Sequence, residues 1–102
     1  MEKDIISMFK NRAEKVLTSS KVRFILFGSR GRGEAEEFSD YDFLILTSEQ
    51  EHGVKEKIEE IEMDMFIKYN AIINSHLFSE EELKHLSFEP FIINALEEGI
   101  AA

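Results

Sequence analysis

The stretch LFGSRGRGEAEEFSDYDFLIL, residues 26–46, contains the features that decide the fold of this chain. Its apolar ends belong to two runs, Val22–Phe27 and Tyr41–Thr47, that read as buried strands because aliphatic and aromatic side chains dominate them. The glycine- and arginine-rich residues 28–33 between them predict a turn that leads into a brief helix around residues 30–36. The stretch therefore predicts two strands joined by a glycine-rich connection.

Two aspartates open the second strand. Side chains at positions i and i+2 of a strand point to the same face, so Asp40 and Asp42 place two carboxylates a few ångströms apart. Such a pair repels itself unless a proton or a cation lies between the two groups, and Mg²⁺ (or Mn²⁺) is a suitable cation. The Gly28-Ser29 turn offers backbone N–H groups and a hydroxyl to a phosphate. The combination indicates metal-assisted phosphoryl or nucleotidyl transfer.

Each half of this pattern also has a purely structural explanation. Gly28-Ser29 is compatible with any turn that needs glycine, and an acidic strand start is common on protein surfaces. However, aspartate is depleted in strands, and the residues directly after Asp42 are all apolar. Two acids at the mouth of a buried strand therefore favour a functional interpretation.

The remaining sequence predicts a small α/β (α+β) domain. Residues 71–78 read as a third strand, so we expect a mixed sheet of three or more strands flanked by helices. Residues 63–69 alternate like a strand but also continue the helical spacing of residues 50–65, and we favour the helix. Helices are predicted at residues 3–18, 50–69, 79–86 (from a capping-box pattern) and 90–99 (from Pro90 to Gly99).

Composition limits the function classes. With 102 residues, 43% of them hydrophobic, the chain supports one domain, residues 1–102, with one core. The absence of cysteine excludes disulfides, thiolate zinc sites and cysteine nucleophiles. A net charge of −9 argues against broad nucleic-acid binding and is compatible with a basic partner, although it also simply favours solubility. Without a signal-peptide pattern or a membrane-length apolar run, we expect a cytoplasmic protein.

The spacing of the motif resembles that of a known family. A strand ending in Gly-Ser, ten residues, and Asp-x-Asp opening the next strand resemble the DNA polymerase β-like nucleotidyltransferase superfamily, and more narrowly its minimal nucleotidyltransferase (MNT) family. The likeness extends to the strand at 71–78, the Ser-x-Glu-Glu-type helix start at 79–83 and the terminal apolar helix at 91–100. The resemblance implies a nucleotidyltransferase-like fold.

The resemblance also implies roles for individual residues. Gly28 and Ser29 would hold the triphosphate of ATP or another nucleoside triphosphate. Asp40 and Asp42 would be the catalytic residues that bind the divalent metal. Arg30 and Arg32 would add positive charge beside the phosphates. The alternative for both arginines is a solvated loop in which they offset neighbouring glutamates.

The implied activity is transfer of a nucleotide monophosphate, AMP from ATP, to a hydroxyl of a protein or small molecule. Members of the family include antitoxins that pair with small helical HEPN-type toxins, so such a protein is an expected partner. The acceptor, the nucleotide preference and the oligomeric state do not follow from the sequence.

One residue expected from the superfamily is missing. A third carboxylate usually lies on the next strand, but residues 73–76 contain neither Asp nor Glu, and Asn74 is the nearest equivalent. An amide cannot act as a general base. Asp64 would replace it only if residues 62–69 formed the strand, and we favour a surface helix there. His76 could supply a base, although a single histidine is more often structural. The alternative function is therefore a weakly active or inactive module that binds nucleotide and a partner.

Overall fold

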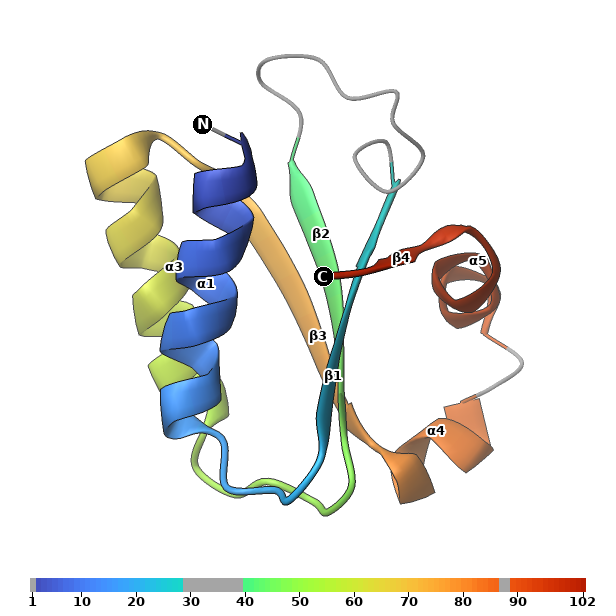
Figure 1. Cartoon of the computed structure of the whole chain (residues 1–102). Coiled ribbons are helices and arrows are strands. Elements are labelled where there is room, and N and C mark those ends of the chain that lie inside the picture. The colour runs from blue at the N-terminus through green and yellow to red at the C-terminus, as the bar shows by residue number, and fades with distance from the viewer. Residues whose placement is uncertain (1, 29–39, 87–88) are drawn as a thin grey trace.

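The computed structural model describes residues 2–28, 40–86 and 89–102 of the chain. The expected α/β architecture is confirmed, because a four-stranded mixed sheet is flanked by helices (Figure 1). The brief helix expected around residues 30–36 lies outside the described residues. In chain order the elements are α1 (Glu2–Val16), β1 (Val22–Phe27), β2 (Tyr41–Thr47), α3 (Lys55–Tyr69), β3 (Ile73–Ser79), α4 (Glu80–Leu86), α5 (Pro90–Glu98) and β4 (Ile100–Ala101).

The strands are arranged in the order β3-β2-β1-β4. β1 and β2 are antiparallel, whereas β2 and β3 are parallel and joined by a crossover through α3, as parallel pairing requires. The two-residue strand β4 pairs antiparallel with β1 and was not predicted. In this order β3 forms one edge of the sheet.

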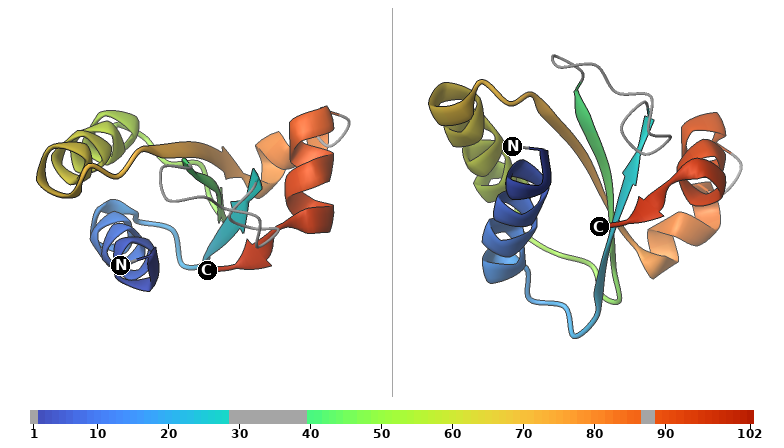
Figure 2. Two further views of the ribbon diagram at one scale, coloured as in Figure 1. Left: turned by 90° about the horizontal axis from the view of Figure 1, so that it is seen from above. Right: turned by 45° about the horizontal axis from the view of Figure 1, so that its top comes forward.

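Helices cover both faces of the sheet. α1 and α3 lie on one face, and α4 and α5 lie on the other (Figure 2). Alternate residues of β2 supply both cores, since Phe43 packs with the α1 and α3 side and Leu44 with the α5 side. The rings of Phe9 in α1 and Phe43 have centroids 4.8 Å apart. A strand that is covered on both faces has to be apolar at nearly every position, which explains the uninterrupted run of apolar residues after Asp42 in β2.

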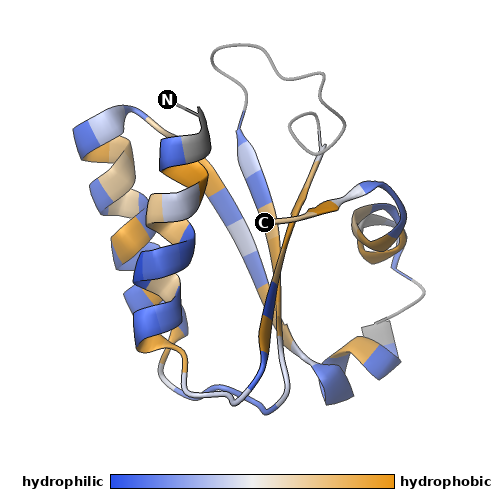
Figure 3. Ribbon diagram, viewed as in Figure 1, coloured by the Kyte–Doolittle hydropathy of each residue, from blue (hydrophilic) through white to orange (hydrophobic). Residues whose placement is uncertain are grey.

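The ambiguous residues 63–69 are helical, as the spacing favoured. α3 ends at Asn70, which adopts the left-handed conformation (φ 55°) and whose N–H donates to the carbonyl of Phe66. One side of the helix buries Ile58, Ile61 and Met65. Figure 3 shows hydrophilic residues alternating with apolar ones along α1 and α3. The helical spacing therefore prevailed over the strand-like alternation, because a helix buries these apolar side chains as one continuous stripe.

α3 begins at Lys55, five residues later than the predicted 50. The preceding segment is occupied by other contacts, because the Glu51 carboxylate accepts hydrogen bonds from the backbone N–H groups of Thr18 (2.9 Å) and Ser19 (2.8 Å) and from both hydroxyls. Burial raises the pKa of Glu51, but these hydrogen bonds outweigh it, and the pKa lies below its ordinary value. Glu51 thus ties the loop after α1 to the loop before α3.

The capping box predicted at residues 79–82 is confirmed. The N–H of Ser79 donates to Oε1 of Glu82, and the N–H of Glu82 donates to Oγ of Ser79, each at 3.2 Å. Pro90 occupies the first turn of α5, as expected, and Gly99 follows its last residue. In the described part of the chain, no helix has the length and apolar character to cross a membrane.

Candidate active site

The end of β1 and the start of β2 meet in the antiparallel pair Phe27 and Asp42. Gly28 follows directly after β1, and Asp40 directly precedes β2. Two segments that are separated by the glycine-rich connection in the sequence therefore lie side by side. Asp40 is exposed and Asp42 is partly buried, as expected for acids at the mouth of a buried strand.

Asn74 joins this pair from the neighbouring strand. The parallel register of β2 and β3 places it opposite Asp42. Its amide Nδ2 donates to Oδ2 of Asp40 at 3.0 Å and to Oδ1 of Asp42 at 3.4 Å. Because both carboxylates accept from one nitrogen, their oxygens point toward a common centre on this face of the sheet.

Gly28 packs directly against Asp42. Its φ is +72°, a conformation that side chains disfavour, and a Cβ at this position would lie 2.5 Å from Oδ2 of Asp42. The backbone conformation therefore favours glycine, and any side chain here would displace the Asp42 carboxylate. The turn glycine and the metal-binding candidate predicted separately from the sequence are parts of one packed unit.

Asp64 does not belong to this site. It lies in α3, where its Oδ2 accepts from Arg12 at 2.8 Å and pairs with Lys68 at 3.3 Å. The hydrogen bond from Arg12 is the main reason that the pKa of Asp64 is lowered. Asp64 is thus a helix residue, as we favoured, and the β3 residue opposite Asp42 is Asn74.

Ser29, Arg30 and Arg32, the other predicted nucleotide-binding residues, lie outside the described residues. Their roles stay predictions.

His76 lies two residues after Asn74 in β3, so both side chains belong to the same face of the sheet. Its ring centroid is 6.1 Å from that of Phe27, the pairing partner of Asp42. His76 therefore lies on the same face as Asn74, one repeat of the strand alternation further from Asp40 and opposite Leu44 in the register. His52 and His85 are exposed, as predicted from their polar surroundings.

The donor set fits a hard divalent cation. Two aspartate carboxylates converge on one centre, and the amide of Asn74 can present either its N–H or its carbonyl oxygen there. Across the described residues there is no group of three or more His, Cys, Asp or Glu side chains suited to a metal. Asp40 and Asp42 are therefore the residues of the described chain that could hold such a cation.

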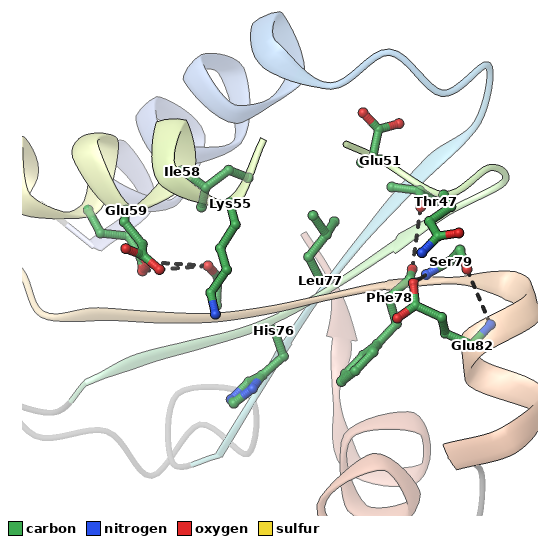
Figure 4. A pocket seen from close by; sticks show the side chains of 13 residues that line it. Thr47, Glu51, Lys55, Ile58, Glu59, His76, Leu77, Phe78, Ser79 and Glu82 are labelled. Atoms are coloured by element: carbon green, nitrogen blue, oxygen red, sulfur yellow. Dashed lines mark hydrogen bonds between the residues drawn. The ribbon is translucent and has the colours of Figure 1, made fainter. Parts of the chain in front are cut away.

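A second feature was not anticipated from the sequence. A groove of about 380 Å³ runs between α3 and the outer edge of β3 (Figure 4). Glu62 of α3 lines it, and its carboxylate accepts a hydrogen bond from the hydroxyl of Ser75, which lies 3.3 Å from Oε1 and 3.5 Å from Oε2. Burial, helped by the nearby charge of Glu59, raises the pKa of Glu62 to about 7. The sequence around Glu62 does not distinguish it from the other glutamates of α3, because its burial and its hydrogen bond depend on the position of Ser75 in β3.

Comparison with known proteins identifies the family of the chain. The family model described as "Nucleotidyltransferase domain" matches residues 6–101, a range that includes Gly28, both aspartates and Asn74. A protein of Methanocaldococcus jannaschii named "Putative protein adenylyltransferase MJ0141" is 36% identical over 78 residues, which cover 76% of this chain and 79% of that protein. The family match thus spans every element that carries the site.

Proposed function

Since the chain belongs to the nucleotidyltransferase domain family, we propose that it transfers AMP from Mg-ATP to a hydroxyl group of a protein acceptor. The observation that carries this proposal is the convergence of Asp40 and Asp42 on one centre beside the Gly28 turn. The name of the archaeal relative supports AMP as the transferred group and a protein as the acceptor.

Asp40 and Asp42 would hold the divalent cation. When bound, the cation neutralises phosphate charge and stabilises the attacking and leaving oxygens of an in-line displacement. In the transfer, the acceptor oxygen forms a bond to the α-phosphorus, the bond from that phosphorus to the bridging oxygen of the β-phosphate breaks, and pyrophosphate leaves. The acceptor hydroxyl gives its proton to solvent or to a neighbouring base.

The turn after β1 would bind the phosphates. Gly28 brings the backbone close to Asp42, and Ser29 would add a hydroxyl donor. Arg30 and Arg32 follow in the sequence and would offset phosphate charge. These four residues complete the nucleotide site that we propose.

Asn74 favours a second candidate function. An amide cannot accept the proton of the acceptor hydroxyl, so a site with Asn74 in this position supports nucleotide binding better than rapid turnover. The alternative is a module that binds nucleotide and a partner with little turnover. A small helical HEPN-type protein, with this chain as its antitoxin, is the partner that we propose in either case.

The direct test uses α-labelled ATP, Mg²⁺ and a co-purified or co-expressed candidate partner. We expect label on the partner, lost by more than about 100-fold in Asp40→Asn and Asp42→Asn variants that still fold. Asp64→Asn is the matched control, since this change also removes one carboxylate, but Asp64 lies in α3 and pairs with Arg12 and Lys68. Absence of label with wild-type protein, while Mg-ATP binding is measured by calorimetry, would support the binding module instead.

The same variants separate chemistry from binding in the antitoxin proposal. If Asp40→Asn and Asp42→Asn no longer protect cells from the partner, protection requires transfer. If they still protect, binding is sufficient. A chain that forms no complex with a helical partner encoded by the neighbouring gene would contradict this part of the proposal.

A further inference from the structure

The outer edge of β3 is unpaired within the described part of the chain. β3 is the last strand in the order β3-β2-β1-β4, and no described strand pairs with its outer side. The N–H of Tyr41 donates to the carbonyl of Ile72 at 2.8 Å, so the even-numbered residues of this strand direct their backbone groups toward β2. The odd-numbered residues Ser75, Leu77 and Ser79 therefore direct theirs outward.

Glutamate side chains cover this edge on both sides of Leu77. Glu62 accepts hydrogen bonds from Ser75, whose hydroxyl lies 3.3 Å from Oε1, and Glu82 accepts from the N–H of Ser79 at 3.2 Å. The contact of the Ser79 N–H agrees with the outward direction of the odd-numbered residues. The backbone of Leu77 lies between the two covered positions and points outward by the same alternation.

The groove along this edge has an acidic lining. Its charged side chains come from α3, from the loop before it and from α4 (Figure 4). The lining contains four glutamates and one lysine, and Glu62, with a pKa of about 7, is only partly ionised at neutral pH. The lining side chains that can carry charge in this way are Glu51, Glu59, Glu62, Glu82 and Lys55. Charge complementarity therefore favours a basic occupant.

We propose that the groove binds an extended, basic segment of the acceptor protein, which pairs with β3 as an added strand. Main-chain hydrogen bonds to an exposed sheet edge supply affinity in this mode of recognition, and alternate side chains supply specificity. One set of side chains, carrying Lys or Arg, enters the groove beside Glu59 and Glu62. The carbonyls of the segment replace Glu62 as acceptors for the edge.

The other set of side chains reaches the candidate active site. In Figure 4, Leu77 points toward α3, whereas His76 points to the opposite side of β3. Asn74 shares that side with His76, and an added strand lies about 4.8 Å from β3. A hydroxyl side chain beside Asn74 would thus face Asp40 and Asp42. This part of the inference rests on the proposed function, whereas strand addition itself does not.

The environment of Glu62 supports displacement by such a segment. Burial and the charge of Glu59 disfavour the Glu62 carboxylate in its present position, although Ser75 stabilises it. A segment that takes over the Ser75 contacts would free Glu62 to pair with an incoming lysine or arginine. Exchange of one acceptor for another leaves the hydrogen bonding of the edge satisfied.

The experiment uses a fluorescein-labelled octapeptide that alternates lysine and threonine, with both termini blocked, and measures its binding by anisotropy. Two N-methylated versions are compared, one methylated at every lysine amide and the other at every threonine amide. Only one of these sets points toward β3 in an added strand. We expect one version to lose at least 10-fold in affinity and the other to stay within 3-fold of the parent. Slower amide exchange at Leu77 on binding is the second expected result.

Protein variants separate this inference from the proposed function. Glu59→Gln combined with Glu62→Gln should weaken peptide binding at least 5-fold, whereas Glu60→Gln, on the same helix but outside the groove lining, should not. Asp40→Asn and Asp42→Asn should abolish transfer, while saturable peptide binding that is sensitive to N-methylation persists. Peptide binding without transfer would therefore retain the inference and count against the proposed chemistry alone.

Three results would overturn the inference. The first is no saturable binding of the parent peptide at low salt. The second is an equal effect of the two N-methylated versions, whether both bind or neither does. The third is evidence for another occupant or another surface. Protection of Leu77 without peptide in a concentration-dependent dimer would make a second copy of the chain the occupant. Peptide-induced shifts centred on the exposed α3 residues Met63, Phe66 and Ile67 would place the peptide on another surface.

Discussion

A Cβ atom on Gly28 would lie 2.5 Å from Oδ2 of Asp42, so the residue that follows β1 and the acid near the start of β2 are packed against each other. Gly28 also has a φ of +72°, which side chains rarely adopt. Any larger residue at position 28 would therefore disturb both the backbone of the turn and the position of the Asp42 carboxylate.

Gly28→Ala tests this relationship. We expect a loss of about 2 kcal/mol or more in the free energy of unfolding, because backbone strain and a steric clash add together, and we expect weaker Mg-ATP binding. Gly53→Ala is the matched control, since Gly53 has a φ of +68° but no atom within 4 Å of the place that an added methyl group would occupy. Urea unfolding of both variants provides the measurement. Equal losses in the two variants would show that the contact with Asp42 has no cost.

Asn74→Asp tests the role of the amide. The change removes the donor shared by Asp40 and Asp42 and adds a third negative charge, so without divalent cations we expect a loss of about 1 kcal/mol, a fall of roughly 4–8 °C in Tm. Mg²⁺ or Mn²⁺ should restore the Tm, because a cation neutralises the cluster.

The control for this variant is Asn94→Asp, which adds the same charge on the exposed side of α5. Thermal unfolding is followed in EDTA and again with added metal. A metal-dependent gain in Tm that is no larger in Asn74→Asp than in Asn94→Asp would argue against a cation site between the carboxylates.

Asp64→Asn should leave nucleotide transfer unchanged. Asp64 pairs with Arg12 and Lys68 on the outer side of the domain, and it does not contact Asp40 or Asp42 through any described hydrogen bond. We expect a small decrease in stability that disappears at high salt, as for other exposed ion pairs. The measurement combines the transfer assay with unfolding at low and high ionic strength. A large loss of transfer would place Asp64 in the reaction.

Glu62→Gln should change how stability depends on pH. The pKa of Glu62 is about 7 in the folded chain and 4.5 as its ordinary value, so the folded state binds the proton more tightly. Its contribution to stability is therefore full below about pH 4.5 and is lost as the pH rises through about 7. Because Glu62 is only half-buried, we discount for solvent screening and expect a loss of about 1–2 kcal/mol.

Urea unfolding at about pH 5.5 and pH 8.5 measures this effect. The stability of wild type relative to Glu62→Gln should fall between the two values, whereas relative to Glu60→Gln, an exposed glutamate on the same helix, it should stay nearly constant. A constant difference for Glu62→Gln as well would mean that this carboxyl is not perturbed by folding.

Local spacing was sufficient for most of the secondary structure. The run of β2 and the capping box at Ser79 were predicted correctly because each depends on a few neighbouring residues. The start of α3 was predicted five residues too early, since Glu51 is engaged by Thr18 and Ser19 from a distant loop. Strand β4 was missed because two residues carry no periodic signal and form a strand only by pairing with β1.

The sequence by itself determined the pair Asp40 and Asp42 and its neighbour Gly28, because alternation along a strand and the conformational freedom of glycine are local properties. Only the tertiary structure decided that Asn74 completes the pair and that Glu62 covers an open sheet edge. Both facts depend on the register of β3 against β2 and on the packing of α3, which are set by contacts between residues far apart in the chain.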